Sequence, residues 1–285
     1  MVINIAGLQI DIRYFSNNIA IFNRLAESYK ECMSEKASDF HIDIDILQEE
    51  NFTINFPTQG SRTIPFVARE GKEKLAFVCS NASATINLKK PNAQIFISSN
   101  NSEETICQLI NVMIRNLVNF WLMQDSRLLL HACGIKTDCG AVLFSGPSES
   151  GKSTVAQLSE PRVILSDETL VIKVEEKYCI TCGTPWYGTV DRWMDITQEV
   201  EGVFFLEKAP QTYSVELRRQ EAMVFLIKNS FIPFGYEKFL PTIAAICYNI
   251  VHMTPCYRLY FTPTPDIWKC IEATLPAVLN RREVN

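Results

Sequence analysis

Nine consecutive residues have the types and the spacing of a phosphate-binding loop. They follow the pattern G-x-x-x-x-G-K-[ST] in full: Gly146, Pro147, Ser148, Glu149, Ser150, Gly151, Lys152, Ser153 and Thr154. In such a loop the lysine reaches the β- and γ-phosphates of a nucleotide, the next serine reaches Mg²⁺, and the glycines permit backbone conformations that a side chain would block. An apolar run at 141–145 precedes the loop, and a helix is expected to begin near Lys152. The sequence therefore predicts a nucleotide-phosphate site; the alternative is a chance match on an ordinary strand-turn-helix connection.

A histidine and an acidic pair lie near this loop along the chain. Asp167 and Glu168 end the apolar run 163–166, and Asp167 comes only fifteen positions after Lys152. We therefore expect the strand before the acidic pair to lie directly beside the strand before the loop. His131 ends the apolar run 128–130, one hairpin before the loop. The plainer interpretations are a hydrogen-bonded core histidine and an acidic pair that begins a turn.

These residues together could transfer a phosphoryl group. That reaction needs charge neutralisation across the phosphate, a metal that bridges the β- and γ-oxygens, and a positioned hydroxyl acceptor. Lys152 and Mg²⁺ would supply the first two. Asp167 is assigned as general base, and Glu168 and Ser153 as ligands of Mg²⁺, although Asp167 and Glu168 could exchange roles.

Three stretches of the chain resemble the HPr kinase/phosphorylase family and its serine-kinase-like relatives, which share their core with phosphoenolpyruvate carboxykinase. The stretches are Leu130-His131-Ala132, residues 140–154 and Leu165-Ser166-Asp167-Glu168. The resemblance is strongest over about 128–170. It implies a carboxykinase-like kinase core in which His131 is the family's histidine, Lys152 its loop lysine, Ser153 its magnesium hydroxyl, and Asp167 with Glu168 its paired aspartates.

The chain departs from that family at two points. Glu168 replaces the second aspartate, which keeps the charge and adds a methylene. The C-terminal stretch that the family's bifunctional members use in dephosphorylation has no counterpart, so phosphorylase activity is not expected. The resemblance leaves a homo-oligomer open.

Other candidate residues lie after the acidic pair. The stretch 183–188 holds Trp186 between glycines and could line the pocket, or form a structural turn. Arg192 could neutralise charge in the transition state, although surface arginines are commoner. Cys179 and Cys182 have the C-x-x-C spacing, but no second pair accompanies them, so a structural role is expected.

The pattern of apolar residues predicts a mixed α/β protein. Residues 1–100 read as a β-rich N-terminal lobe with a helix at 17–32, and residues 101–285 as the ATP-binding core, which begins with a long helix at 105–124. Asn101 and Glu104 have the spacing of a capping box for that helix. The core should be a mixed sheet with helices, including strands at 128–135 and 256–261.

Composition narrows the possible partners. The net charge of −5 and the absence of a basic run argue against nucleic acid, and polar residues interrupt the helix at 105–124, which argues against a membrane span. Ten scattered cysteines and the lack of a signal peptide favour a reducing, cytoplasmic location.

The leading hypothesis is an ATP- and Mg²⁺-dependent kinase that phosphorylates a hydroxyl, most simply a serine in a peptide or protein. A kinase of a small molecule such as free serine is the closest alternative. A nucleotide-binding regulatory protein without transfer is a second, and decarboxylation in the carboxykinase manner is a third.

Overall fold

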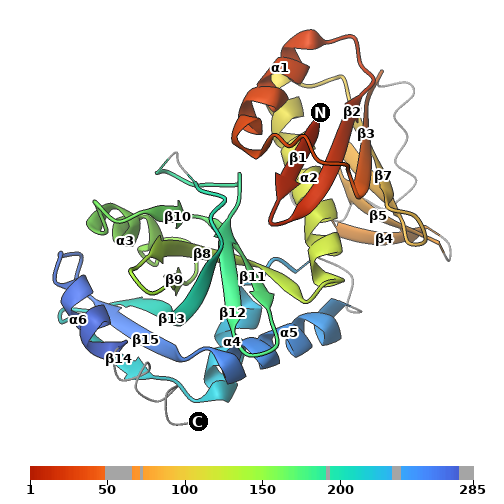
Figure 1. The fold of residues 1–285 in the computed structure, drawn as a ribbon. Helices are drawn as coiled ribbons and strands as arrows, with labels where there is room; N and C mark the ends of the chain where they lie inside the picture. Colours follow the sequence, from red (N-terminus) through yellow and green to blue (C-terminus); the bar gives the residue numbers. More distant parts are fainter. Residues whose placement is uncertain (49–65, 71–72, 191–192, 233–238, 276–285) are drawn as a thin grey trace. The chain divides into compact units, whose positions relative to one another are not determined.

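The computed structural model describes residues 1–48, 66–70, 73–190, 193–232 and 239–275. The contacts divide the chain into two compact units. Unit 1 comprises Met1–Leu122 and Ile232–Phe239, and unit 2 comprises Met123–Phe231 and Leu240–Asn285. Both units hold a mixed sheet, and the described residues form six α-helices, so the predicted mixed α/β class is confirmed (Figure 1).

Unit 1 is built on a seven-stranded sheet. Its strands are β1 (Val2–Ile5), β2 (Leu8–Tyr14), β3 (Phe40–Leu47), β4 (Phe66–Glu70), β5 (Lys74–Cys79), β6 (Ala82–Asn87) and β7 (Asn92–Ser98). They lie in the order β1-β2-β3-β7-β6-β5-β4, and β3 is parallel to both of its neighbours. Helix α1 (Ile19–Ser28) begins at Asn18, whose side chain accepts the N–H groups of Ala20 and Ile21, and a 3-10 turn (Lys30–Cys32) follows it. Seven of the described strands therefore lie in the first 98 residues of the chain.

The long helix α2 (Glu103–Met123) belongs to unit 1 and not to the core that follows, where the sequence placed it. Its contacts explain this: the Tyr29 hydroxyl donates to Asn111 at 2.7 Å, and Trp121 stacks on Phe40 of β3 at 4.4 Å. The domain boundary therefore lies at the end of α2. Its cap also differs from the expectation, because the Thr105 N–H donates to Ser102 Oγ.

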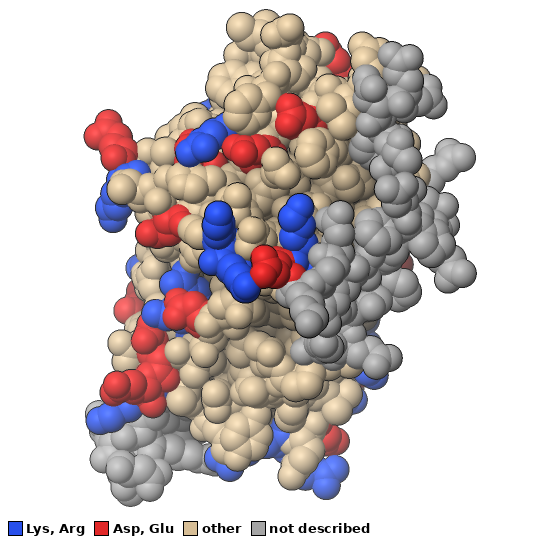
Figure 2. All heavy atoms as spheres, turned by 90° about the vertical axis from the view of Figure 1, so that its right-hand side faces the viewer, with Lys and Arg blue, Asp and Glu red and all other residues tan. Residues whose placement is uncertain are grey.

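Helix α2 is the one helix among the described residues with the length and apolar composition to cross a membrane, and 61% of its most apolar window is buried in the structure. Such burial is typical of a helix in the core of a folded unit. Figure 2 draws one face of the molecule, on which lysine and arginine side chains are interspersed with acidic ones and form no continuous basic stripe.

Unit 2 is built on an eight-stranded sheet. Its strands are β8 (Arg127–Lys136), β9 (Ala141–Ser145), β10 (Ile164–Ser166), β11 (Thr169–Val174), β12 (Cys179–Gly183), β13 (Gln198–Lys208), β14 (Tyr213–Glu216) and β15 (Cys256–Phe261). Strands β9, β13 and β15 are parallel to one another, and the other pairs are antiparallel. The pairings β8-β11-β12-β13-β9-β8 close a ring, and β15 and β14 extend the sheet from β13.

The sequence predicted that the strand before the acidic pair lies directly beside the loop strand β9. This prediction is wrong. Strand β10 pairs with β8, and β8 lies between β10 and β9. The reason is that both edges of β9 are already taken. The tight turn at 137–140 makes β8 its hairpin partner on one edge, and β13 pairs with the other edge.

Helices cover both faces of this sheet. Helices α3 (Lys152–Leu158) and α6 (Ile267–Thr274) share one hydrophobic cluster with Phe144 of β9 and Phe204 and Leu206 of β13. Phe205 points to the opposite face, where it stacks at 5.0 Å on Phe225 of α4 (Arg219–Asn229). Helix α5 (Phe239–Met253) completes the described helices. The alternation along β13 therefore fixes which of its residues face α3 and the predicted loop.

Candidate active site

A cavity of about 400 Å³ opens at the carboxyl ends of β9 and β13, entirely within unit 2. Its volume is typical of small-molecule sites. The residues that line it are His131, Ser148, Glu149, Gly151, Lys152, Ser153, Thr154, Glu168 and Lys208. The structure thus brings the predicted loop, the histidine and one residue of the acidic pair to one place.

The loop at 146–154 follows β9 and includes the first turn of α3. A side chain would not fit at two of its glycines. Gly151 has a φ of 106°, and a Cβ there would lie 2.5 Å from the ring of Phe261. At Gly146 a Cβ would lie 2.6 Å from Ser150 Oγ. Glu149 also has a positive φ, 64°, which is unfavourable for a residue with a side chain. The loop is therefore tightly folded around its own backbone.

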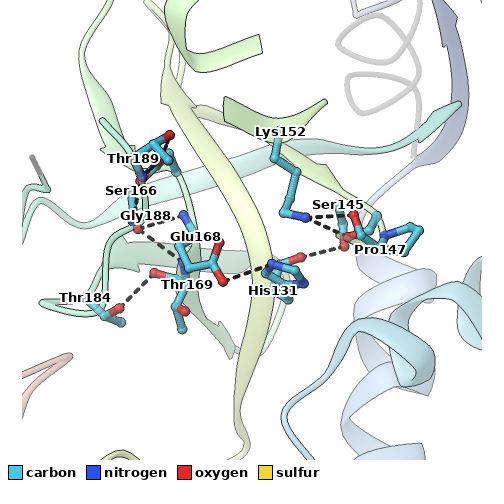
Figure 3. A network of polar contacts seen from close by, with 12 residues as sticks. His131, Ser145, Pro147, Lys152, Ser166, Glu168, Thr169, Thr184, Gly188 and Thr189 are labelled. Atoms are coloured by element: carbon cyan, nitrogen blue, oxygen red, sulfur yellow. Dashed lines mark hydrogen bonds and ion pairs between the residues drawn. The ribbon is translucent and has the colours of Figure 1, made fainter. Parts of the chain in front are cut away.

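Lys152 is the first residue of α3, and its side chain turns back over the loop. Its Nζ donates to the carbonyl oxygens of Gly146 at 2.9 Å and Pro147 at 3.0 Å (Figure 3). An ammonium group has three N–H donors, so one remains for a ligand. Burial lowers the pKa of Lys152 from its usual value, and the nearby carboxylate of Glu168 partly opposes that shift. An anion in the cavity would favour the charged form.

His131 and Glu168 form a close pair at the side of the cavity. His131 Nε2 lies 3.2 Å from Glu168 Oε1, as Figure 3 shows. Two backbone contacts hold the pair: the Ala132 N–H donates to the Glu168 carbonyl at 3.1 Å, and Ser145 Oγ donates to the His131 carbonyl at 3.0 Å. The Glu168 side chain is 40% exposed, so its carboxylate is accessible to a ligand.

Asp167 has a different environment from the residue next to it. Its carboxylate is fully buried and accepts backbone N–H groups from Gly188 at 2.7 Å, Thr189 at 2.9 Å and Val190 at 3.1 Å. It is not among the residues that line the cavity. Asp167 therefore anchors the segment 188–190, and Glu168 supplies the acidic group on the cavity side.

Trp186, Cys179 and Cys182 are not among the residues that line the cavity. Trp186 is buried, and the nearby Thr184 hydroxyl donates to the Thr169 carbonyl at 2.8 Å, so this segment packs against β11. Arg192 lies outside the described residues. Cys179 and Cys182 are buried in β12, and burial raises the pKa of the Cys182 thiol to about 12.

Lys208 also lines the cavity, although no sequence pattern predicted a role for it. It is the last residue of β13, which runs parallel to the loop strand β9. Ligands of parallel sheets bind at the carboxyl ends of the strands, so a charged residue at the end of a strand next to the loop strand was the available signal.

The cavity also suits a magnesium ion that arrives with a nucleotide. The described residues contain no cluster of three metal-ligating side chains. Mg²⁺ commonly takes only one or two protein ligands and completes its shell with phosphate oxygens and water. Ser153 and Glu168 both line the cavity and carry the oxygen ligands that this ion prefers.

No protein-family model matches the chain, and no curated protein matches it. The function must therefore be argued from the cavity itself.

Proposed function

We propose that this protein is an ATP-dependent kinase with a carboxykinase-like core, and that it transfers the γ-phosphoryl group to a serine hydroxyl of a peptide or protein. The observation that carries the proposal is that the loop of the G-x-x-x-x-G-K-[ST] pattern shares one cavity with the His131–Glu168 pair. A phosphate cradle alone would suit any nucleotide-binding protein. A carboxylate paired with a histidine beside it adds the group that a transfer reaction requires.

The loop and Lys152 would bind the polyphosphate. The backbone N–H groups of a phosphate loop point toward one centre, and Lys152 has one N–H donor left after its bonds to the loop carbonyls. The folded loop would hold these N–H groups in place before the nucleotide binds. Little reorganisation is then needed as charge develops on the transferred group.

Ser153 would hold Mg²⁺ together with the phosphate oxygens, and the ion would neutralise charge between the β- and γ-phosphates when it is bound. Ser153 follows the loop lysine, the usual position of the magnesium hydroxyl in this motif.

Glu168 is a better candidate for general base than Asp167, the residue to which the sequence assigned that role. The Asp167 carboxylate already accepts three backbone N–H groups, whereas the Glu168 carboxylate faces the cavity. The acceptor hydroxyl would lose its proton to Glu168 as its oxygen bonds to the γ-phosphorus and the bond from that phosphorus to the ADP oxygen breaks. His131 orients the carboxylate through their contact of 3.2 Å.

The test is transfer of label from γ-labelled ATP, with Mg²⁺, to a library of serine-containing peptides and to free serine. Wild type should label an acceptor, and Lys152→Ala and Glu168→Gln should each reduce labelling by at least about 100-fold. Arg218→Ala is the control, because Arg218 forms an exposed pair with Glu221 away from the cavity. Binding of ATP without labelling of any acceptor would favour a regulatory nucleotide-binding protein, and labelling of free serine alone would favour a small-molecule kinase.

A further inference from the structure

The second lysine of the cavity, Lys208, lies beside the phosphate loop because of the register of two parallel strands. Phe205 of β13 pairs with Ser145, the last residue of β9, and Lys208 follows three residues later. Three residues of a strand extend about 10 Å, so β13 continues alongside the loop after β9 has ended. The backbone agrees with this, because the carbonyl of Leu206 would lie 3.7 Å from a Cβ at Gly146.

The side chain of Lys208 points to the loop side of the sheet. Alternation along β13 places Phe204 and Leu206 on the face of α3, and Lys208 follows on that face. Glu207 lies on the opposite face and pairs with Arg258 at 3.4 Å. Lys208 itself is exposed and lines the cavity, and within the described residues it forms no ion pair.

The charged residues that line the cavity indicate a role for Lys208. The lining carries the cations Lys152 and Lys208 and the carboxylates Glu149 and Glu168. Lys152 directs two of its donors to the loop carbonyls. A polyphosphate brings several negative charges past two carboxylates, and all three ammonium donors of Lys208 are open to it.

We propose that Lys208 is a second phosphate-binding cation, which contacts the polyphosphate of the donor from the β13 side while Lys152 contacts it from the loop. It fills the charge-neutralising role for which Arg192 was a candidate from the sequence. This inference rests on the proposed function, since it assumes that a polyphosphate occupies the cavity.

The experiment is calorimetric measurement of the affinity of the full chain for MgATP and for magnesium tripolyphosphate. The variants are Lys208→Ala, Lys208→Arg, Lys152→Ala and Lys177→Ala. Lys177 is an exposed lysine between β11 and β12 that does not line the cavity, so its removal controls for the change in net charge. Lys208→Ala should weaken the binding of both ligands by about tenfold, which is the effect of losing one charge-assisted hydrogen bond. Lys208→Arg should bind within about threefold of wild type, and Lys177→Ala should match wild type.

The outcomes separate this inference from the proposed function. If the wild-type protein binds neither ligand, the proposed function fails. Suppose that wild type binds both ligands, that Lys208→Ala binds them as tightly as wild type, and that Lys152→Ala binds them more weakly. The proposed function then stands and the inference is wrong. Loss of MgATP affinity with unchanged tripolyphosphate affinity also overturns it, because Lys208 would then contact the nucleoside. Because Lys208 is exposed, its variants should retain the wild-type unfolding temperature, and a large drop in that temperature would contradict the position described.

Discussion

One cavity lies at the carboxyl ends of strands β9 and β13, and another lies at their amino ends. The two cavities have nearly equal volumes. The phosphate-loop cavity at the carboxyl ends measures about 400 Å³, and the cavity at the amino ends measures about 380 Å³. The second one is lined by Lys136, Thr137, Asp138, Cys139, Arg162, Glu201, Trp268, Glu272 and Leu275. Each cavity has two basic residues and at least two acidic ones in its walls, so volume and charge do not distinguish them.

The two cavities differ in what their polar groups already contact. In the second one Arg162 pairs with Glu272 at 2.6 Å and lies 3.9 Å above the ring of Trp268, and the Thr137 hydroxyl donates to Glu201. In the phosphate-loop cavity Lys152 keeps one donor, and Lys208 keeps all of its donors. A cavity binds a ligand when its donors are oriented but not yet satisfied by the protein. This comparison yields four predictions.

The largest expected effect is on nucleotide binding. Lys152→Ala should weaken MgATP binding by at least about 100-fold, because the variant loses a partly buried cation that faces the phosphates. Arg162→Ala, the matched change in the second cavity, should leave binding unchanged and lower the free energy of unfolding by about 1 kcal/mol. Calorimetry and urea unfolding measure the two quantities. Equal losses of affinity in both variants would refute the distinction between the cavities.

Asp167 and Glu168 should show the same contrast, between a carboxylate that the protein already satisfies and one that faces the cavity. Asp167→Asn should lower the free energy of unfolding by about 2–3 kcal/mol, because an amide cannot accept all three buried N–H groups. Glu168→Gln should change the unfolding free energy by less than about 0.5 kcal/mol and reduce the rate of transfer by about 100-fold or more. Urea unfolding and the labelling assay separate the two effects. A stable Asp167→Asn protein without activity would return the general-base role to Asp167.

A smaller effect is expected from backbone strain in the loop. Glu149→Gly should raise the free energy of unfolding by about 1 kcal/mol, because glycine adopts the φ of 64° without steric cost. Gly151→Ala tests the opposite change, and it should destabilise the protein because its Cβ would meet Phe261. Thermal unfolding of both variants checks the signs. A less stable Glu149→Gly protein would mean that the carboxylate makes a stabilising contact that outweighs the strain.

The smallest expected effect comes from filling the second cavity. Cys139 lines it and is exposed, whereas Cys133, Cys182, Cys247 and Cys256 are buried and their pKa values are raised by burial. A bulky maleimide should therefore react with Cys139 before these four, and the modified protein should bind MgATP like wild type. Mass spectrometry identifies the labelled cysteine, and Cys139→Ser is the unlabelled control. Loss of MgATP binding on labelling would connect the two cavities.

Local patterns predicted the elements well. The strands at 141–145 and 256–261 have the predicted bounds, because apolar periodicity and turn residues are properties of neighbours in sequence. Residues 2–12 have the pattern of a single strand-like run but form a hairpin, since Ala6 and Gly7 adopt positive φ values of 52° and 87°. An Ala-Gly pair is a weak turn signal.

Contacts between distant residues were less predictable. The motif located the loop, and the positions of His131 and Glu168 after apolar runs marked them as candidates; the structure brings all of these together in one cavity. The anchoring of Asp167 depends on residues 188–190, more than twenty positions away, and nothing in the sequence marks these as its partners. The position of Lys208 depends on the register of β13 with β9. Burial and register decide the roles of such residues, and a single sequence does not specify either.

The placement of β8 between β9 and β10 determines how far the acidic group stands from the phosphate loop. Neighbouring strands lie about 4.8 Å apart, so an acidic strand next to β9 would have held Glu168 one strand spacing from the loop. With β8 in between, the separation is two spacings, about 10 Å. In the proposed reaction, this backbone separation would accommodate a phosphoryl group and an attacking oxygen between the loop and the carboxylate. Because continuous backbone hydrogen bonds set it, side-chain substitutions in the cavity should leave this reaction gap unchanged.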